Sequence, residues 1–147
     1  MTEKHQKIIN WMLSLSREDQ IFYADRQLWN IYHGLRERGD TIYRINQTIV
    51  GLFRLFVSAD LDASQPEYLF FKEVTGIDYT NDLFYKFTNH GRGEKFIADT
   101  MKWLESLNID LYSAVFTFGV YLMISDGPLH KDEIKLVDMI EQHRPNK

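Results

Sequence analysis

The apolar side chains of this chain recur with the spacing of an α-helix almost from end to end. In most segments they stand three or four residues apart. No segment shows the alternation at every second residue, bounded by turn residues, that is typical of a strand. Because an amphipathic helix must bury its apolar stripe against another element, the pattern predicts an all-α protein built as a compact bundle of about seven or eight helices.

Capping and turn residues divide this pattern into separate helices. Thr2 and Ser16 suit the N-caps of the first two, Gly39 suits the end of the second, and Asp110 is expected to cap a later one. The predicted helices cover about residues 3–15, 16–39, 41–59, 64–74, 81–90, 94–107, 111–125 and 131–143. Ile8 of the first helix and Ile42 of the third lie on apolar stripes and are expected in the core.

The chain reads as one domain over residues 1–147. This length is usual for a single domain and lets roughly two-thirds of the surface of the unfolded chain be buried. No low-complexity segment and no Ser/Gly-rich linker interrupts the series of helices. A single hydrophobic core is therefore expected.

Composition excludes several classes of protein. The chain has no cysteine, which removes disulfides and thiolate metal sites and favours a cytoplasmic location. No signal peptide opens it, and its longest uncharged run, residues 111–125, is shorter than the roughly 18 apolar residues of a membrane span. We therefore expect a buried helix there and no transmembrane segment. A net charge of −4 argues against a nucleic-acid partner.

The charge is distributed unevenly. Six acidic residues and a single basic one, Lys72, lie between residues 55 and 82, whereas arginines are frequent just upstream. The acids are Asp60, Asp62, Glu67, Glu73, Asp78 and Asp82, and the arginines are Arg26, Arg36, Arg38, Arg44 and Arg54. A cation or a basic partner is conceivable near the acidic stretch, and an anionic partner near the arginines.

The chain contains an internal repeat. A shift of 66 residues places residues 48–74 on residues 114–140, and each copy reads as a buried helix, a short loop and an amphipathic helix. The same shift places Asp60 on Asp126 and Glu67 on Glu133. The simplest interpretation is structural, because an Asp can close the turn after the first helix and a Glu can meet the free amides at the start of the second.

The second copy, from Ile124 through Asp126-Gly127 to Glu133, resembles the Asp-Gly…Glu signature of the TerB-like family of tellurite-resistance proteins. The resemblance covers residues 115–140 and extends loosely to residue 48, where Leu61 follows Asp60 in place of glycine. It implies a compact all-α fold, a role in stress responses, and scaffolding at the inner membrane surface. It also implies divalent-cation binding by Asp126 and Glu133, then by Asp60 and Glu67. Carboxylate oxygens suit Ca²⁺ or Mg²⁺.

Known catalytic and metal-binding motifs are not present. The segment from Asp60 begins like an EF-hand loop, but Gln65 and Phe71 stand where glycine and glutamate are required. No phosphate-binding glycine-rich loop, zinc-protease motif or nucleophile elbow occurs. Most aromatic residues have core spacing, but Phe22, Tyr23, Trp29 and Tyr32 spread over more than one face of the second helix and could leave a groove for a partner helix.

The leading hypothesis is a non-enzymatic, TerB-like interaction module that binds a protein partner in a stress-related setting, with a divalent cation as an added feature. Two alternatives remain open. One is a metal-assisted hydrolase that uses two of the loop carboxylates. The other is a structural homodimer that associates through an exposed aromatic face.

Overall fold

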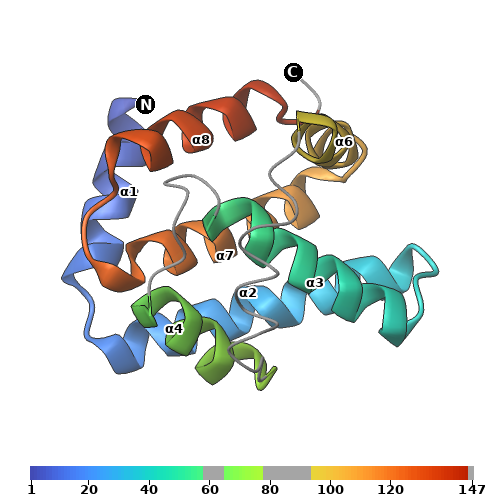
Figure 1. Cartoon of the computed structure of the whole chain (residues 1–147), viewed down its shortest axis with the longest axis horizontal. Coiled ribbons are helices and arrows are strands. Elements are labelled where there is room, and N and C mark those ends of the chain that lie inside the picture. The colour runs from blue at the N-terminus through green and yellow to red at the C-terminus, as the bar shows by residue number, and fades with distance from the viewer. Residues whose placement is uncertain (58–64, 78–93, 146–147) are drawn as a thin grey trace.

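The computed structural model describes residues 1–57, 65–77 and 94–145, and these residues form seven α-helices and one 3₁₀ turn (Figure 1). The elements are α1 (Glu3–Ser14), α2 (Arg17–Glu37), α3 (Ile42–Val57), α4 (Gln65–Thr75), α6 (Glu94–Glu105), α7 (Ile109–Met123), η1 (Ile124–Asp126) and α8 (Lys131–Gln142). No strand occurs in these ranges, which confirms the all-α class. The helix predicted at residues 81–90 lies outside the described residues.

Side-chain caps set the first two helix starts, as predicted. Thr2 Oγ1 accepts a hydrogen bond from the amide of His5 at 3.2 Å, and Ser16 Oγ accepts one from the amide of Asp19 at 3.1 Å. Each bond satisfies one of the amides that have no partner at a helix start. Gly39 follows α2 with a φ of 96°, a conformation that glycine adopts without strain.

The predicted cap of the seventh helix was wrong. Asn108 is the N-cap, and its Oδ1 accepts from the amide of Leu111 at 2.8 Å. Asp110 instead lies in the first turn, where its negative charge meets the positive end of the helix dipole. The earlier start brings Ile109 into the helix, where it packs against the core.

Helix α7 is the central element of the bundle. It packs against α2, α3, α4 and α8, and Figure 1 shows it between α8 and α2. Its sequence is apolar on nearly every side, as expected of a helix surrounded by others. Residues Ile109–Asp126 are long and apolar enough for a membrane span, but 61% of this window is buried within the fold, as in the core helix of a bundle.

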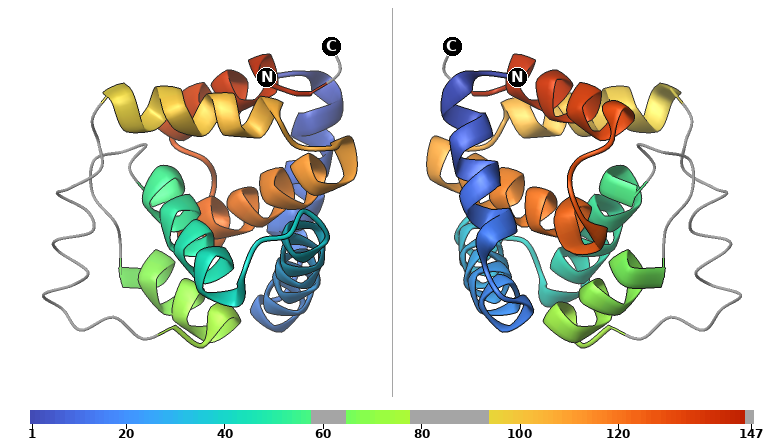
Figure 2. Two further views of the ribbon diagram at one scale, coloured as in Figure 1. Left: turned by 90° about the vertical axis from the view of Figure 1, so that its right-hand side faces the viewer. Right: turned by 90° about the vertical axis from the view of Figure 1, so that its left-hand side faces the viewer.

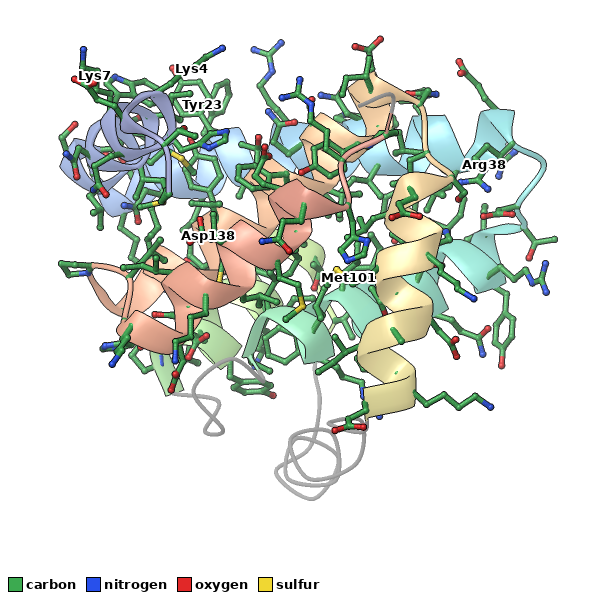
Figure 3. All side chains as sticks on the ribbon, turned by 90° about the horizontal axis from the view of Figure 1, so that it is seen from above. Lys4, Lys7, Tyr23, Arg38, Met101 and Asp138 are labelled. Carbon is green, nitrogen blue, oxygen red and sulfur yellow. The ribbon has the colours of Figure 1, made fainter. Side chains whose placement is uncertain are left out.

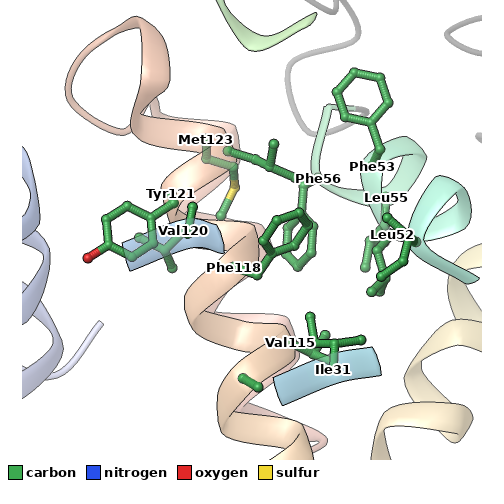
Figure 4. Packing of buried hydrophobic residues seen from close by; sticks show 14 of the residues in the cluster. Ile31, Leu52, Phe53, Leu55, Phe56, Val115, Phe118, Val120, Tyr121 and Met123 are labelled. Atoms are coloured by element: carbon green, nitrogen blue, oxygen red, sulfur yellow. The ribbon is translucent and has the colours of Figure 1, made fainter. Parts of the chain in front are cut away.

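The contact between α3 and α7 forms the middle of the hydrophobic core. Phe56 of α3 reaches α7 beside Phe118 (Figure 4), and both side chains are almost fully buried. Phe53 of α3 stacks on Phe71 of α4, with ring centroids 4.2 Å apart. Stacked and interlocking rings of this kind add to the burial energy and hold the helices in one register.

The order of the described helices agrees with two related helix–loop–helix units. Helix α3 is followed by α4 in the first unit, and α7 is followed by α8 in the second. The two first helices of these units, α3 and α7, pack against each other.

Helix α1 closes the side of the bundle where α8 lies (Figure 2). The N-terminal ammonium lies 3.1 Å from a carboxylate oxygen of Asp138, and Nε2 of His5 lies 3.8 Å from Oε1 of Glu141. On α7, the phenol of Tyr112 donates to the same Glu141 oxygen at 2.8 Å. Glu141 therefore links three helices.

Part of the predicted core was wrong. Ile42, expected to be buried in the third helix, is 56% exposed, and Ile8 of the first helix is 45% exposed. Ile42 is the first residue of α3, and because side chains on a helix lean toward its N-terminus, that of Ile42 leans away from the body of the helix. Trp11, Phe22 and Trp29 are also at least half exposed.

Candidate interaction surface

The four carboxylates of the repeated loops differ in their surroundings. Glu67 and Glu133 are each the third residue of a helix, and each side chain is only 1% exposed. Asp126 ends η1 and is exposed. Asp60 lies outside the described residues. The repeat therefore places two glutamates in equivalent buried positions.

Glu133 acts as a helix cap. Its Oε1 accepts a hydrogen bond from the backbone amide of His130 at 2.8 Å, one turn earlier. His130 itself is exposed and stands at the N-cap of α8. This hydrogen bond is the glutamate half of a capping box, and it supports the structural interpretation of the repeated glutamate.

A metal centre is not formed by the described side chains alone. Within residues 1–57, 65–77 and 94–145, no three histidine, aspartate or glutamate side chains gather closely enough to hold a metal ion. Helix α4, which carries Glu67, does pack against η1, which carries Asp126. Because Asp60 is not among these residues, a site formed by Asp60, Glu67, Asp126 and Glu133 stays a prediction.

A different feature stands out on the surface, along α2 and the start of α3. We call it the aromatic surface and define it by Phe22, Arg26, Trp29, His33, Ile42 and Tyr43. The first four are spaced by four, three and four residues, which puts them on one face of α2. Phe22 is 55% exposed, Trp29 60% and Tyr43 72%.

Contacts within the aromatic surface hold its rings in place. The imidazole of His33 stacks on the indole of Trp29, with centroids 4.6 Å apart and planes inclined by 20°. The guanidinium of Arg26 lies over the ring of Phe22 at 5.8 Å. Both contacts lower the rotamer freedom that these side chains would lose on binding a partner.

A groove of about 610 Å³ runs along this surface between α2 and α3. Leu28 is buried and Tyr32 is partly buried, whereas Trp29 and Ile42 are exposed; Asp25, His33 and Arg36 supply the polar groups. The phenol of Tyr32 donates to Oδ1 of Asn46, which links α2 to α3 beneath the groove. Burial of this phenol raises the pKa of Tyr32.

A second hollow, of about 570 Å³, lies on the opposite side of His33, between α2 and α7. Its walls are mostly polar, with Asn30, Glu37 and Asp110 among the residues that line it. His33 lines both hollows and therefore lies between the apolar groove and the polar one.

The arrangement of side chains favours binding over catalysis. The groove offers ring faces and aliphatic groups with a few charged groups beside them, which is the composition of sites that hold apolar side chains. The sequence predicted a groove among Phe22, Tyr23, Trp29 and Tyr32, but Tyr23 packs against the core. Ile42, which was expected in the core, and Tyr43 on α3 were not predicted to lie on this surface.

Comparisons with protein-family models, with curated proteins and with solved structures gave no match to this chain. The resemblance to the TerB-like family therefore stays a prediction that rests mainly on residues 115–140.

Proposed function

We propose that this chain is a non-enzymatic interaction module that holds an amphipathic helix of a protein partner in the groove between α2 and α3. One observation carries the proposal. Trp29 and Ile42 are 60% and 56% exposed and line one groove of about 610 Å³. Phe22, on the same face of α2 as Trp29, and Tyr43, next to Ile42 on α3, are 55% and 72% exposed.

The energy available from this surface is substantial. Burying a large apolar side chain contributes about 1.5–3 kcal/mol, and tryptophan and arginine are frequent among the residues that dominate binding energy. The Trp29–His33 stack is already formed, so less side-chain entropy is lost when a partner covers it. A helix that presents residues one turn apart would match the groove between two helices.

The charges beside the groove indicate an acidic partner. Arg36 lines the groove and Arg26 lies over Phe22, whereas Asp25 is the one acidic residue among the groove's lining residues. Acidic residues along the edges of a partner helix would therefore speed association and fix its direction.

A second copy of the chain is a poorer occupant of the same groove. A two-fold interface through the aromatic surface would place the arginines of one copy near the same arginines of the other. Such contacts between like charges oppose association. Repulsion between the arginines therefore favours a different protein, and not a second copy of the chain, as the occupant of the groove.

The setting proposed for this module is a cytoplasmic stress response of the tellurite-resistance type. Support comes from the Asp126-Gly127…Glu133 pattern and its repeat at Asp60 and Glu67. Binding of Ca²⁺ or Mg²⁺ by these four carboxylates would be an additional property of the module. No specific observation favours the metal-assisted hydrolase.

The proposal is tested by selecting helical peptides from a displayed library against the wild-type protein and measuring their affinities by calorimetry. We expect peptides with an apolar stripe flanked by acids, and we expect Trp29→Ala or Phe22→Ala to weaken them at least about tenfold. Leu69→Ala and Met139→Ala are matched controls, because these exposed apolar residues lie on α4 and α8.

Two results would contradict the proposal. An equal loss of affinity in the control variants would show that the peptides bind exposed apolar side chains in general and not this groove. A concentration-dependent dimer in light scattering that Trp29→Ala abolishes would assign the groove to a second copy of the chain.

A further inference from the structure

A separate hollow of about 410 Å³ lies where the end of α2, the start of α3 and α6 meet. It is lined by Arg38, Asp40, Arg44, Gln47, Thr48 and Trp103. Figure 3 shows Arg38, at the end of α2, beside α6. The residues come from α3, from α6 and from the connection between α2 and α3, so only the folded chain brings them together.

The hollow carries positive charge that the neighbouring side chains leave unbalanced. In the part of the chain that the structure describes, neither Arg38 nor Arg44 forms an ion pair with a carboxylate. Asp40 is the only acid among the six lining residues, which leaves two guanidinium groups against one carboxylate. The start of α3 adds the positive end of a helix dipole to the same place. The chain as a whole has a net charge of −4, so the excess of positive charge at this hollow is a local feature.

An aromatic side chain, Trp103, forms part of the wall of the hollow. Trp103 of α6 lines the hollow and is partly buried, with its ring packed against the core. Gln47 supplies an amide that can donate or accept, and Asp40 supplies a carboxylate that can only accept. The hydroxyl of Thr48 donates a hydrogen bond to the backbone carbonyl of Arg44 at 3.0 Å, so its oxygen can still accept a hydrogen bond from a ligand.

From this combination we propose that the hollow binds a small phosphorylated ligand with a planar ring, of the nucleoside monophosphate class. Guanidinium groups match the geometry of phosphate oxygens and bind them with paired hydrogen bonds. The ring of the ligand would stack on Trp103, and its hydroxyl or amino groups would donate to Asp40 and Gln47. A hollow of 410 Å³ is within the usual size of small-molecule sites.

This site is independent of the groove on the aromatic surface. Ile42 lines that groove, whereas Arg44, two residues further along α3, lines this hollow. Residues two apart on a helix point to different sides, so the two sites open on different sides of α3.

The test is calorimetry on the full chain with adenosine monophosphate, adenosine and inorganic phosphate as separate probes. We expect adenosine monophosphate to bind, phosphate to bind more weakly and adenosine not to bind. Arg38→Gln and Arg44→Gln should each weaken adenosine monophosphate at least about tenfold, which corresponds to the loss of one charged hydrogen-bonding group. Lys135→Gln, which removes an exposed cation on α8 away from both sites, is the control and should leave the affinity unchanged.

Three outcomes would overturn the proposal. No binding of adenosine monophosphate or phosphate at millimolar concentration removes the site. An equal loss of affinity in Lys135→Gln would show that the ligand is attracted by charge in general and not by this hollow. Equal affinities for phosphate and adenosine monophosphate would show that the ring adds nothing to binding and would exclude a ligand of the nucleoside monophosphate class. Since Arg38 and Arg44 are exposed, their variants should fold, and an unchanged thermal transition verifies this.

Discussion

Gly119 of α7 lies against the ring of Phe56 of α3, so closely that a Cβ atom at position 119 would overlap three carbon atoms of that ring. Both residues are buried, and the contact lies in the middle of the interface between the two related helices. Glycine is therefore required at position 119 by packing and not by backbone conformation.

This contact predicts that Gly119→Ala destabilises the protein by at least about 1–3 kcal/mol, because a methyl group in a packed core forces side chains from their rotamers. Urea denaturation followed by circular dichroism measures the change. The control is Gly51→Ala, also inside a helix, where a new Cβ atom would meet nothing within 4 Å. That variant should be stabilised by about 0.5–1 kcal/mol, since alanine favours a helix over glycine.

A double variant separates the clash from other effects of the substitution. Phe56→Leu removes ring atoms at the point of overlap, so Gly119→Ala should cost less in the Phe56→Leu background than in the wild type. Identical costs in both backgrounds would show that Phe56 is not the residue in conflict.

The capping role of Glu133 gives a second prediction. Glu133→Ala should lower the free energy of unfolding by about 1–3 kcal/mol, since the amide of His130 loses the partner now 2.8 Å away. Glu133→Gln should retain most of the stability, because glutamine also serves in a capping box. Asp132→Ala, at the exposed neighbouring position, is the comparison in the same denaturation series.

Alkaline pH should destabilise the fold. Burial raises the pKa of Tyr121 to about 12. Burial, and to a lesser extent the hydrogen bond to Glu141, raise the pKa of Tyr112 well above its usual value. In the unfolded chain both phenols ionise near about pH 10. The native state thus holds these protons more tightly. The contribution of the two phenols to the free energy of unfolding is therefore constant below pH 10 and falls as the pH rises toward 12.

Tyrosinate absorbance and urea denaturation at a series of pH values measure this effect. Tyr121→Phe should make the fall in stability above pH 10 less steep, because the variant has one fewer phenol to ionise on unfolding. A fall of equal steepness in wild type and variant would mean that Tyr121 ionises normally in the native state.

The hypothesis of a divalent-cation site predicts heat of binding when Ca²⁺ or Mg²⁺ is titrated into the protein. Asp126→Ala should remove that heat, since a hard cation loses a charged oxygen ligand. Asp132→Ala, which removes an exposed carboxylate outside the predicted set, should not. Absence of heat with the wild type eliminates the cation from the proposed function.

Much of the helical architecture followed from the sequence, because helix formation depends on neighbours a few residues away. Thr2 and Ser16 mark helix starts through bonds to amides three residues on, and Glu133 caps α8 through the amide of His130. The shift of 66 residues that relates the two units is likewise visible in the chain itself. Local competition explains the error at Asp110, since Asn108 offers an equally good cap two residues earlier.

The surfaces were decided by the tertiary structure. A helical stripe shows that Ile42, Phe22 and Trp29 are apolar, but whether a neighbour covers them depends on where the other helices end. Arg44 and Trp103 are brought to one hollow although they lie far apart in the chain. Periodicity reports only the side of a helix that is able to be buried, whereas contact between distant residues depends on how whole helices pack, and that is why the sequence determined the bundle and the fold determined its sites.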